Sequence, residues 1–144
     1  MVPVNLYAES SAVLAWLMGE TRRAAAGRQL RKAERVFASD LTLVECNRVI
    51  IRAISLEEIS ERRAKLCQSR LMKASVSWHM LRLGADVVDR ARLPFPVEPI
   101  RTLDALHIAS ALIAQTAFPD LALLTLDTRV RTNAKELGFR VLPK

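Results

Sequence analysis

The strongest constraint on the fold is the alternation of short apolar runs with longer segments of helical periodicity. Runs that suit buried strands occupy residues 4–8, 36–38, 77–81, 121–126 and 139–142. Helical patterns lie between them, at residues 10–18, 21–33, 56–73, 85–92, 102–115 and 128–137, and in one helix that runs from a cap at Ser39 or Asp40 to about residue 54. This alternation predicts an α/β fold in which helices cover both faces of a mostly parallel sheet of about five strands.

Length and composition favour a single domain over residues 1–144. A chain of 144 residues with 51% apolar side chains can bury one hydrophobic core. No apolar run reaches the length of a membrane span, and the first residues lack the basic and apolar segments of a secretion signal. Cys46 and Cys67 form no CxxC pair, which fits two buried thiols in a reducing compartment. We therefore expect a cytoplasmic protein without a membrane partner.

The charge balance points to a polyanionic partner. The chain has 22 Lys and Arg against 15 Asp and Glu, a net charge of +7. Nucleic acid is the commonest partner of small basic domains, and an acidic protein is the alternative. The segment 21–33 holds much of this charge in Arg22, Arg23, Arg28, Arg31 and Lys32. It either steers a nucleic acid or forms an ordinary solvated helix face.

Four acidic residues lie where a parallel α/β fold builds its sites, at the carboxyl ends of strands. Glu9 follows the first strand, Glu45 lies one turn into the helix after the second strand, Asp104 lies in the first turn of helix 102–115, and Asp127 follows the fourth strand. Each has a structural alternative. Glu9 would favour a helix dipole, Asp104 and Asp127 would cap helices, and Glu45 alone reads as half of an exposed ion pair with Arg48.

Asp104 is the most informative of these acids. Its helix is apolar on nearly every side and is expected to be mostly buried. An uncompensated carboxylate there would cost several kcal/mol or would be protonated. Asp104 therefore needs backbone donors, a basic neighbour or a cation.

Carboxylates gathered from distant segments repel one another, and each raises the pKa of its neighbours. Mg²⁺ or Mn²⁺ resolves this conflict because both prefer oxygen ligands, and both can promote attack on a phosphodiester. Without a metal we expect the cluster to destabilise the fold. The sequence thus indicates a metal site formed by the four acids.

Several further residues have assigned supporting or structural roles. Ser11 is expected to orient Glu9 or a water, or to cap its helix, and Thr125 to point near Asp127. Arg48 and Arg52 share the stripe of Glu45, where they either hold phosphates or carboxylates of a partner beside the metal or serve as surface charge. His107 is interpreted as a satisfied core residue rather than a general base. Trp16 and Trp78 are expected in core or dimer contacts, and His79 has no assigned partner.

Four motifs carry a resemblance to a known family. They cover residues 6–17, 41–45, 101–109 and 124–129 and contain Glu9, Glu45, Asp104 and Asp127 in turn. Their order, across essentially the whole chain, resembles the PIN-domain ribonucleases, specifically the VapC-like toxins of bacterial toxin–antitoxin pairs. The resemblance implies a PIN-like three-layer α/β/α fold and endonucleolytic cleavage of RNA with Mg²⁺ or Mn²⁺ at the four acids. It also implies a homodimer and an antitoxin partner that inserts a segment into the acidic cleft.

One position departs from the family pattern. The first acid is normally aspartate, and Glu9 is one methylene longer with the same charge. The alternative function is therefore a degenerate PIN-like module that binds RNA or protein with weak or no nuclease activity. A phosphatase or nucleotide-binding domain is disfavoured, because no glycine-rich phosphate loop follows any predicted strand.

Overall fold

The centre of the protein is a parallel five-stranded sheet. The structure is a computed structural model that describes residues 3–19 and 24–144. The strands follow the order β3-β2-β1-β4-β5, and every neighbouring pair is parallel. Their bounds are Asn5–Ala8 for β1, Arg35–Ser39 for β2, His79–Leu81 for β3, Ala122–Leu124 for β4 and Arg140–Leu142 for β5. The predicted α/β class with about five strands is confirmed.

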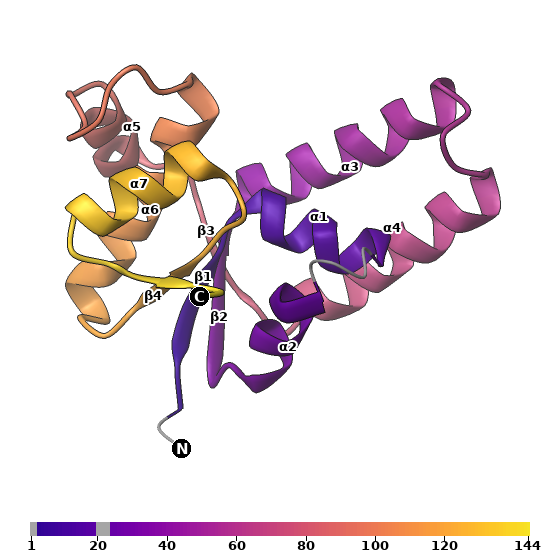
Figure 1. Ribbon diagram of the computed structural model, residues 1–144, viewed down its shortest axis with the longest axis horizontal. Coiled ribbons are helices and arrows are strands. Elements are labelled where there is room, and N and C mark those ends of the chain that lie inside the picture. Colours follow the sequence, from indigo (N-terminus) through magenta and orange to yellow (C-terminus); the bar gives the residue numbers. More distant parts are fainter. Residues whose placement is uncertain (1–2, 20–23) are drawn as a thin grey trace.

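Helices cover both faces of the sheet (Figure 1). One layer holds α1 (Ser10–Met18), α2 (Ala24–Lys32), α3 (Asp40–Ser55) and α4 (Glu61–Ser75); the other holds α5 (Ala85–Ala91), α6 (Thr102–Ala117) and α7 (Thr128–Glu136). Successive strand residues face opposite layers. Tyr7 packs with Ile108 of α6, whereas Leu6 and Ala8 belong to the cores under the first layer. Burial on both faces explains the continuous apolar strand runs.

Side-chain caps set several helix starts. Ser39 and Thr42 form a capping box at α3, as the sequence predicted for Ser39. The helix predicted from residue 56 begins only at Glu61, which corrects that boundary. There Glu57 has a positive φ of 58°, and the Ser60 side chain accepts the backbone N–H of Arg63 at 3.1 Å. The turn and the new cap therefore delay the start of the helix that the charge pattern placed at residue 56.

Other sequence expectations meet the structure more simply. Arg22 and Arg23 lie outside the described residues, and the described part of that helix starts at Ala24. Cys46 and Cys67 are buried free thiols, as expected. Trp16 and Trp78 are half-buried against each other, with ring centroids 6.3 Å apart. In residues 3–19 and 24–144 no helix combines the length and the apolar character needed to cross a membrane.

The strand order creates a switch point beside β1. From β1 the chain proceeds through β2 to β3 on one side, whereas β4 and β5 lie on the other side. The helices that leave β1 and β4 therefore enter opposite layers, which opens a crevice between the carboxyl ends of these two strands. Glu9 directly follows β1, and Asp127 lies three residues beyond the end of β4. The topology thus brings two of the four acids to one place.

Candidate active site

All four predicted acids line one cavity at this switch point. The cavity measures about 280 Å³, and its lining includes Glu9, Glu45, Asp104 and Asp127 with Ser11 and Arg101. Glu9 comes from the end of β1, Glu45 from α3, Asp104 from α6 and Asp127 from the start of α7. Acids more than 100 positions apart in sequence therefore face the same small space.

Glu9 is buried and is held by two hydroxyl groups. Its Oε2 accepts hydrogen bonds from Ser11 and, at 2.8 Å, from Thr125. Each hydroxyl also accepts a backbone N–H, Ser11 that of Leu126 at 2.9 Å and Thr125 that of Asp127 at 3.1 Å. The backbone after β4 thus sets the two hydroxyls, and the hydroxyls set the carboxylate.

Glu45 is fixed by a chain of contacts that begins in the core. The Tyr7 hydroxyl contacts Nδ1 of His107 at 2.8 Å, and Nε2 of His107 donates to Oε1 of Glu45. Ser10 donates to the same oxygen at 3.0 Å. Tyr7 of β1 packs on the side of the sheet that α6 covers, His107 belongs to α6, and Glu45 belongs to α3 in the other layer. The contacts therefore join the two helix layers around the edge of the sheet.

The pKa shifts of Tyr7 and Glu45 agree with the direction of these hydrogen bonds. Burial, foremost, raises the pKa of Tyr7, and the charges of Glu9 and Glu45 add to the effect. Tyr7 therefore stays protonated and donates to His107, whose Nε2–H is left for Glu45. Burial also acts to raise the pKa of Glu45. Hydrogen bonds from His107 and Ser10 and the charge of Arg101 outweigh it, so the pKa of Glu45 is lowered.

Asp104 and Asp127 share one guanidinium group. Arg101 precedes α6, and its Nε donates to Oδ2 of Asp104 at 2.9 Å. Its Nη2 donates to Oδ1 of Asp104 at 3.2 Å and to Oδ2 of Asp127 at 2.7 Å. The other oxygen of Asp127 caps α7 by accepting the N–H of Val130 at 3.0 Å. Arg101 is the basic neighbour that buried Asp104 requires, and Asp127 is the helix cap that the sequence suggested.

The donors suit a hard divalent cation in their chemistry. Carboxylates and hydroxyls are the oxygen ligands that Mg²⁺ and Mn²⁺ prefer, and Arg101 already places one positive charge between two of the acids. In the part of the chain that the structure describes, however, no three acidic, histidine or cysteine side chains converge closely enough to hold one ion. Arg101, His107 and the two hydroxyls engage the acids separately instead.

Comparisons with known proteins agree with this fold. The family model described as the PIN domain matches residues 6–136. The chain belongs to the PIN-domain family. Ribonuclease VapC46 of Mycobacterium tuberculosis is 33% identical over 138 residues, which are 95% of each chain. Ribonuclease VapC35 of the same species is 31% identical over 140 residues, 96% of this chain and 87% of the relative.

Solved structures share the PIN-like fold. The crystal structure of M. tuberculosis VapC20, described as a toxin that cleaves the sarcin–ricin loop, has a TM-score of 0.64 and 16% identity and covers 93% of this chain and 95% of its own. A toxin–antitoxin complex from Klebsiella pneumoniae has a TM-score of 0.61 and 17% identity, with 96% of both chains covered. At these identities the likeness concerns the fold alone.

Within this PIN domain, Arg48 and Arg52 lie apart from the acids. Both are exposed on α3 and line a separate cavity of about 330 Å³, which none of the four acids lines. The expected exposed ion pair between Glu45 and Arg48 is wrong. Glu45 is half-buried and pairs with His107 instead. The helical pattern treats α3 as isolated, whereas α3 packs against α1 and β2.

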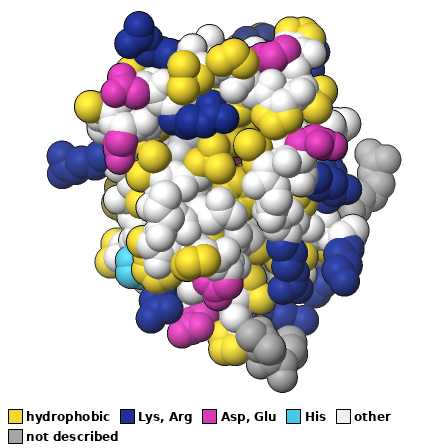
Figure 2. Space-filling view, turned by 90° about the vertical axis from the view of Figure 1, so that its left-hand side faces the viewer, with side chains coloured by type: hydrophobic (Ala, Val, Ile, Leu, Met, Phe, Trp, Pro, Cys, Tyr) yellow, Lys and Arg dark blue, Asp and Glu magenta, His cyan; other side chains and the backbone are white. Residues whose placement is uncertain are grey.

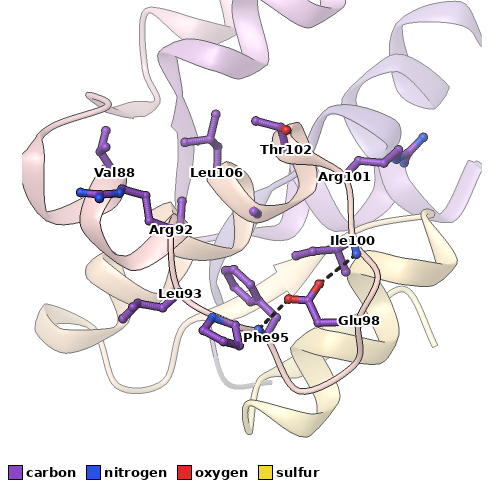
Figure 3. A pocket seen from close by; sticks show the side chains of 12 residues that line it. Val88, Arg92, Leu93, Phe95, Glu98, Ile100, Arg101, Thr102 and Leu106 are labelled. Carbon is purple, nitrogen blue, oxygen red and sulfur yellow. Dashed lines mark hydrogen bonds between the residues drawn. The ribbon is translucent and has the colours of Figure 1, made fainter.

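A larger cavity of about 530 Å³ adjoins the acidic one and shares Arg101 and Thr102 with it. Figure 3 shows the ring of Phe95 in the middle of the residues that line this cavity and the side chain of Arg101 turned away to one side. Both carboxylate oxygens of Glu98 accept backbone N–H groups, those of Phe95 and Ile100, each at 3.0 Å.

The face formed by α5, α6 and α7 carries basic side chains scattered among apolar and acidic ones (Figure 2).

Four residues of the site escaped the sequence interpretation in whole or in part. His107 is buried, as expected, but its contact with Glu45 was not foreseen, and Tyr7 and Ser10 had no assigned role. Arg101 was part of a motif without a role of its own. A basic residue three positions before a buried aspartate is a signal that sequence alone offers for Arg101. The contacts of His107 span 62 and 100 positions, so no local pattern reveals them.

Proposed function

We propose that this PIN domain is an endoribonuclease, the toxin of a toxin–antitoxin pair in the cytoplasm, with residues 1–144 acting as one domain. Glu9, Glu45, Asp104 and Asp127 are its metal-binding and catalytic residues, and Mg²⁺ or Mn²⁺ is its cofactor. The supporting observation is that all four acids line one cavity at the switch point. The 33% identity to a protein named as a ribonuclease adds to it.

In this reaction the cation would supply charge, and residues of the chain would orient the carboxylates. A divalent cation supplies charge that offsets the charge on a phosphodiester during in-line attack and promotes ionisation of the attacking water. Ser11 and Thr125 hold Glu9, and His107 holds Glu45, so these carboxylates enter the cavity already oriented. Preorganised groups need no reorganisation when charge develops in the transition state.

Cleavage of a labelled RNA tests this proposal directly. Mg²⁺ or Mn²⁺ should support cleavage, and EDTA should abolish it. Asp104→Asn removes the charge and keeps the shape, so activity should fall by at least about 100-fold. Asp89→Asn is the matched control, because Asp89 is exposed on α5 and forms an ion pair with exposed Arg92 at 3.9 Å. Undiminished cleavage by Asp104→Asn would exclude the assigned site.

Glu9 is the position that favours the second function, a degenerate module that binds RNA or protein. Its longer side chain is pinned by two hydroxyls in a buried position, which limits how it can adjust to an ion. The native protein and Glu9→Asp should be compared with the same RNA and metal. If only Glu9→Asp cuts the RNA, the native chain is the binding module; comparable cutting by both supports the nuclease.

The partners of the site are proposed from the same likeness. RNA is the substrate, a small antitoxin is the protein partner, and the toxin forms a homodimer. Arg48 and Arg52 hold RNA phosphates or antitoxin carboxylates. Arg48→Gln and Arg52→Gln should weaken binding, whereas Arg62→Gln, an exposed arginine on α4, should not. Light scattering tests the dimer, and co-purification with the product of a neighbouring small gene tests the antitoxin.

A further inference from the structure

Arg101 occupies an unusual position for a residue without an assigned role. Its single guanidinium bonds to both oxygens of Asp104 and to one oxygen of Asp127. These two aspartates start different helices, α6 and α7. Because their like charges face one cavity, a cation between them is favourable, and Arg101 supplies that charge from within the chain. This charge lowers the pKa of Glu45 as well, as a contribution smaller than those of His107 and Ser10.

The two sides of this contact differ in how firmly they are held. The Asp104 side chain is only 7% exposed and that of Asp127 23%, whereas the Arg101 side chain is 59% exposed. The cap on Val130 fixes Asp127 independently of Arg101. Ion pairs with an exposed partner are weak, since water replaces them at little cost. Arg101 can therefore leave while the cap keeps Asp127 in place. Buried Asp104, whose hydrogen bonds in the described residues both come from Arg101, then needs another cation in exchange.

A divalent cation and Arg101 would compete for the same carboxylate oxygens. All three hydrogen bonds of the Arg101 guanidinium in the described structure end on Asp104 and Asp127. An ion bound to these aspartates would displace the guanidinium by charge repulsion and by loss of acceptors. Arg101 stands at the boundary of the acidic cavity and the larger cavity of Figure 3, which share it. A displaced guanidinium thus stays beside the site, where its planar donor fork suits a phosphate.

We propose that Arg101 is the built-in counter-ion of Asp104 and Asp127, that it yields them to a divalent cation, and that it then binds a phosphate of the RNA. The inference rests on the proposed function for the identity of the cation and the RNA. In this proposal the cation binds Asp104 and Asp127 first, and the released Arg101 then binds RNA beside them.

Manganese titration calorimetry of the intact protein provides the first test. Arg101→Met keeps the aliphatic stem and removes the charge, so Mn²⁺ should bind about tenfold more tightly than to the native protein. Asp104→Asn should bind Mn²⁺ weakly or not at all. Arg92→Met is the matched control, because Arg92 lines the larger cavity and, among the described residues, pairs with exposed Asp89 alone. The Mn²⁺ affinity of this variant should not change.

The second test measures RNA binding at saturating Mn²⁺ with an uncleavable 2′-O-methyl oligonucleotide. Arg101→Met should bind the oligonucleotide about tenfold more weakly than the native protein, because one phosphate contact is lost. Arg92→Met should retain native affinity. Opposite changes in Mn²⁺ and oligonucleotide affinity are not expected from a merely structural arginine, which would weaken both.

Arginine NMR tests the native protein without relying on a variant that must fold. In ¹⁵N-arginine-labelled protein without metal, the Nε–H of Arg101 should exchange slowly because it is bonded to Asp104. Mg²⁺ should release it to fast exchange. If Mg²⁺ binds and Nε–H stays protected, or if Arg101→Met binds Mn²⁺ like the native protein while Asp104→Asn does not, the counter-ion role is wrong and the metal site stands. If the native protein binds no metal, the proposed function itself fails, and the inference with it.

Discussion

Replacement of His107 by leucine tests the buried contacts that fix Glu45. His107 is 1% exposed, and it joins the fully buried Tyr7 hydroxyl to Glu45. Leucine has a similar volume but neither accepts from Tyr7 nor donates to Glu45. A buried donor left without its acceptor costs about 1–3 kcal/mol. The Glu45 carboxylate loses less, because its side chain is 23% exposed and water can replace the bond. We expect the free energy of unfolding to fall by about 2–3 kcal/mol.

Urea denaturation at pH 7 measures this loss, and a double-mutant cycle assigns it. Adding Tyr7→Phe to His107→Leu removes the orphaned hydroxyl, so the double variant should be about 1 kcal/mol more stable than the sum of the single changes predicts. His79→Leu is the matched control, since His79 is exposed on β3 and should change stability by less than about 0.5 kcal/mol. Strict additivity of Tyr7→Phe and His107→Leu would refute the coupling.

Four further outcomes follow from the same structure. Because the pKa of Glu45 is lowered in the fold, Glu45→Gln should be less stable than the native protein at pH 7. In urea titrations this difference in stability should disappear as the pH falls below the ordinary pKa of glutamate, about 4.3. Asp127→Ala should lose about 1 kcal/mol with the cap on Val130, whereas Asp127→Ser should keep the cap and still lose RNA cleavage. Gly138 has a φ of 88°, so Gly138→Ala should lower thermal stability by about 1 kcal/mol without changing cleavage. EDTA should stop cleavage. It should lower the melting temperature, relative to the protein with metal, by no more than about 2 °C, because Arg101 holds the aspartates without a metal.

The sheet was predictable because its strands are buried on both faces. Such strands appear as continuous apolar runs, and the helices between them carry clear caps at Ser39 and Asp127. The positions of Glu9 and Asp127 at the carboxyl edge follow from that topology alone. Helix α4 was misplaced because the turn at Glu57 depends on a local backbone conformation that a charge pattern does not encode.

The partners of the acids were harder to predict than the acids themselves. The burial of Asp104 required a compensating group, and Arg101 proved to be that group three residues away. The environment of Glu45 was misread, since its stripe on α3 appears exposed until His107 of α6 reaches it across the edge of the sheet. Contacts between helix layers arise from packing, and no periodicity within one helix reports them.

Each of the four carboxylates that line the cavity has a partner within the chain. The sequence suggested that such a cluster would destabilise the fold in the absence of metal. Instead, two hydroxyls hold Glu9, His107 holds Glu45, and Arg101 bridges Asp104 and Asp127. Glu9, Glu45 and Asp127 each have a partner other than Arg101. The contact of Arg101 with the two aspartates is the one whose partner side chain is mostly exposed. The fold therefore fixes the acids first, and the exchange of Arg101 for a cation becomes a local event that need not disturb the core.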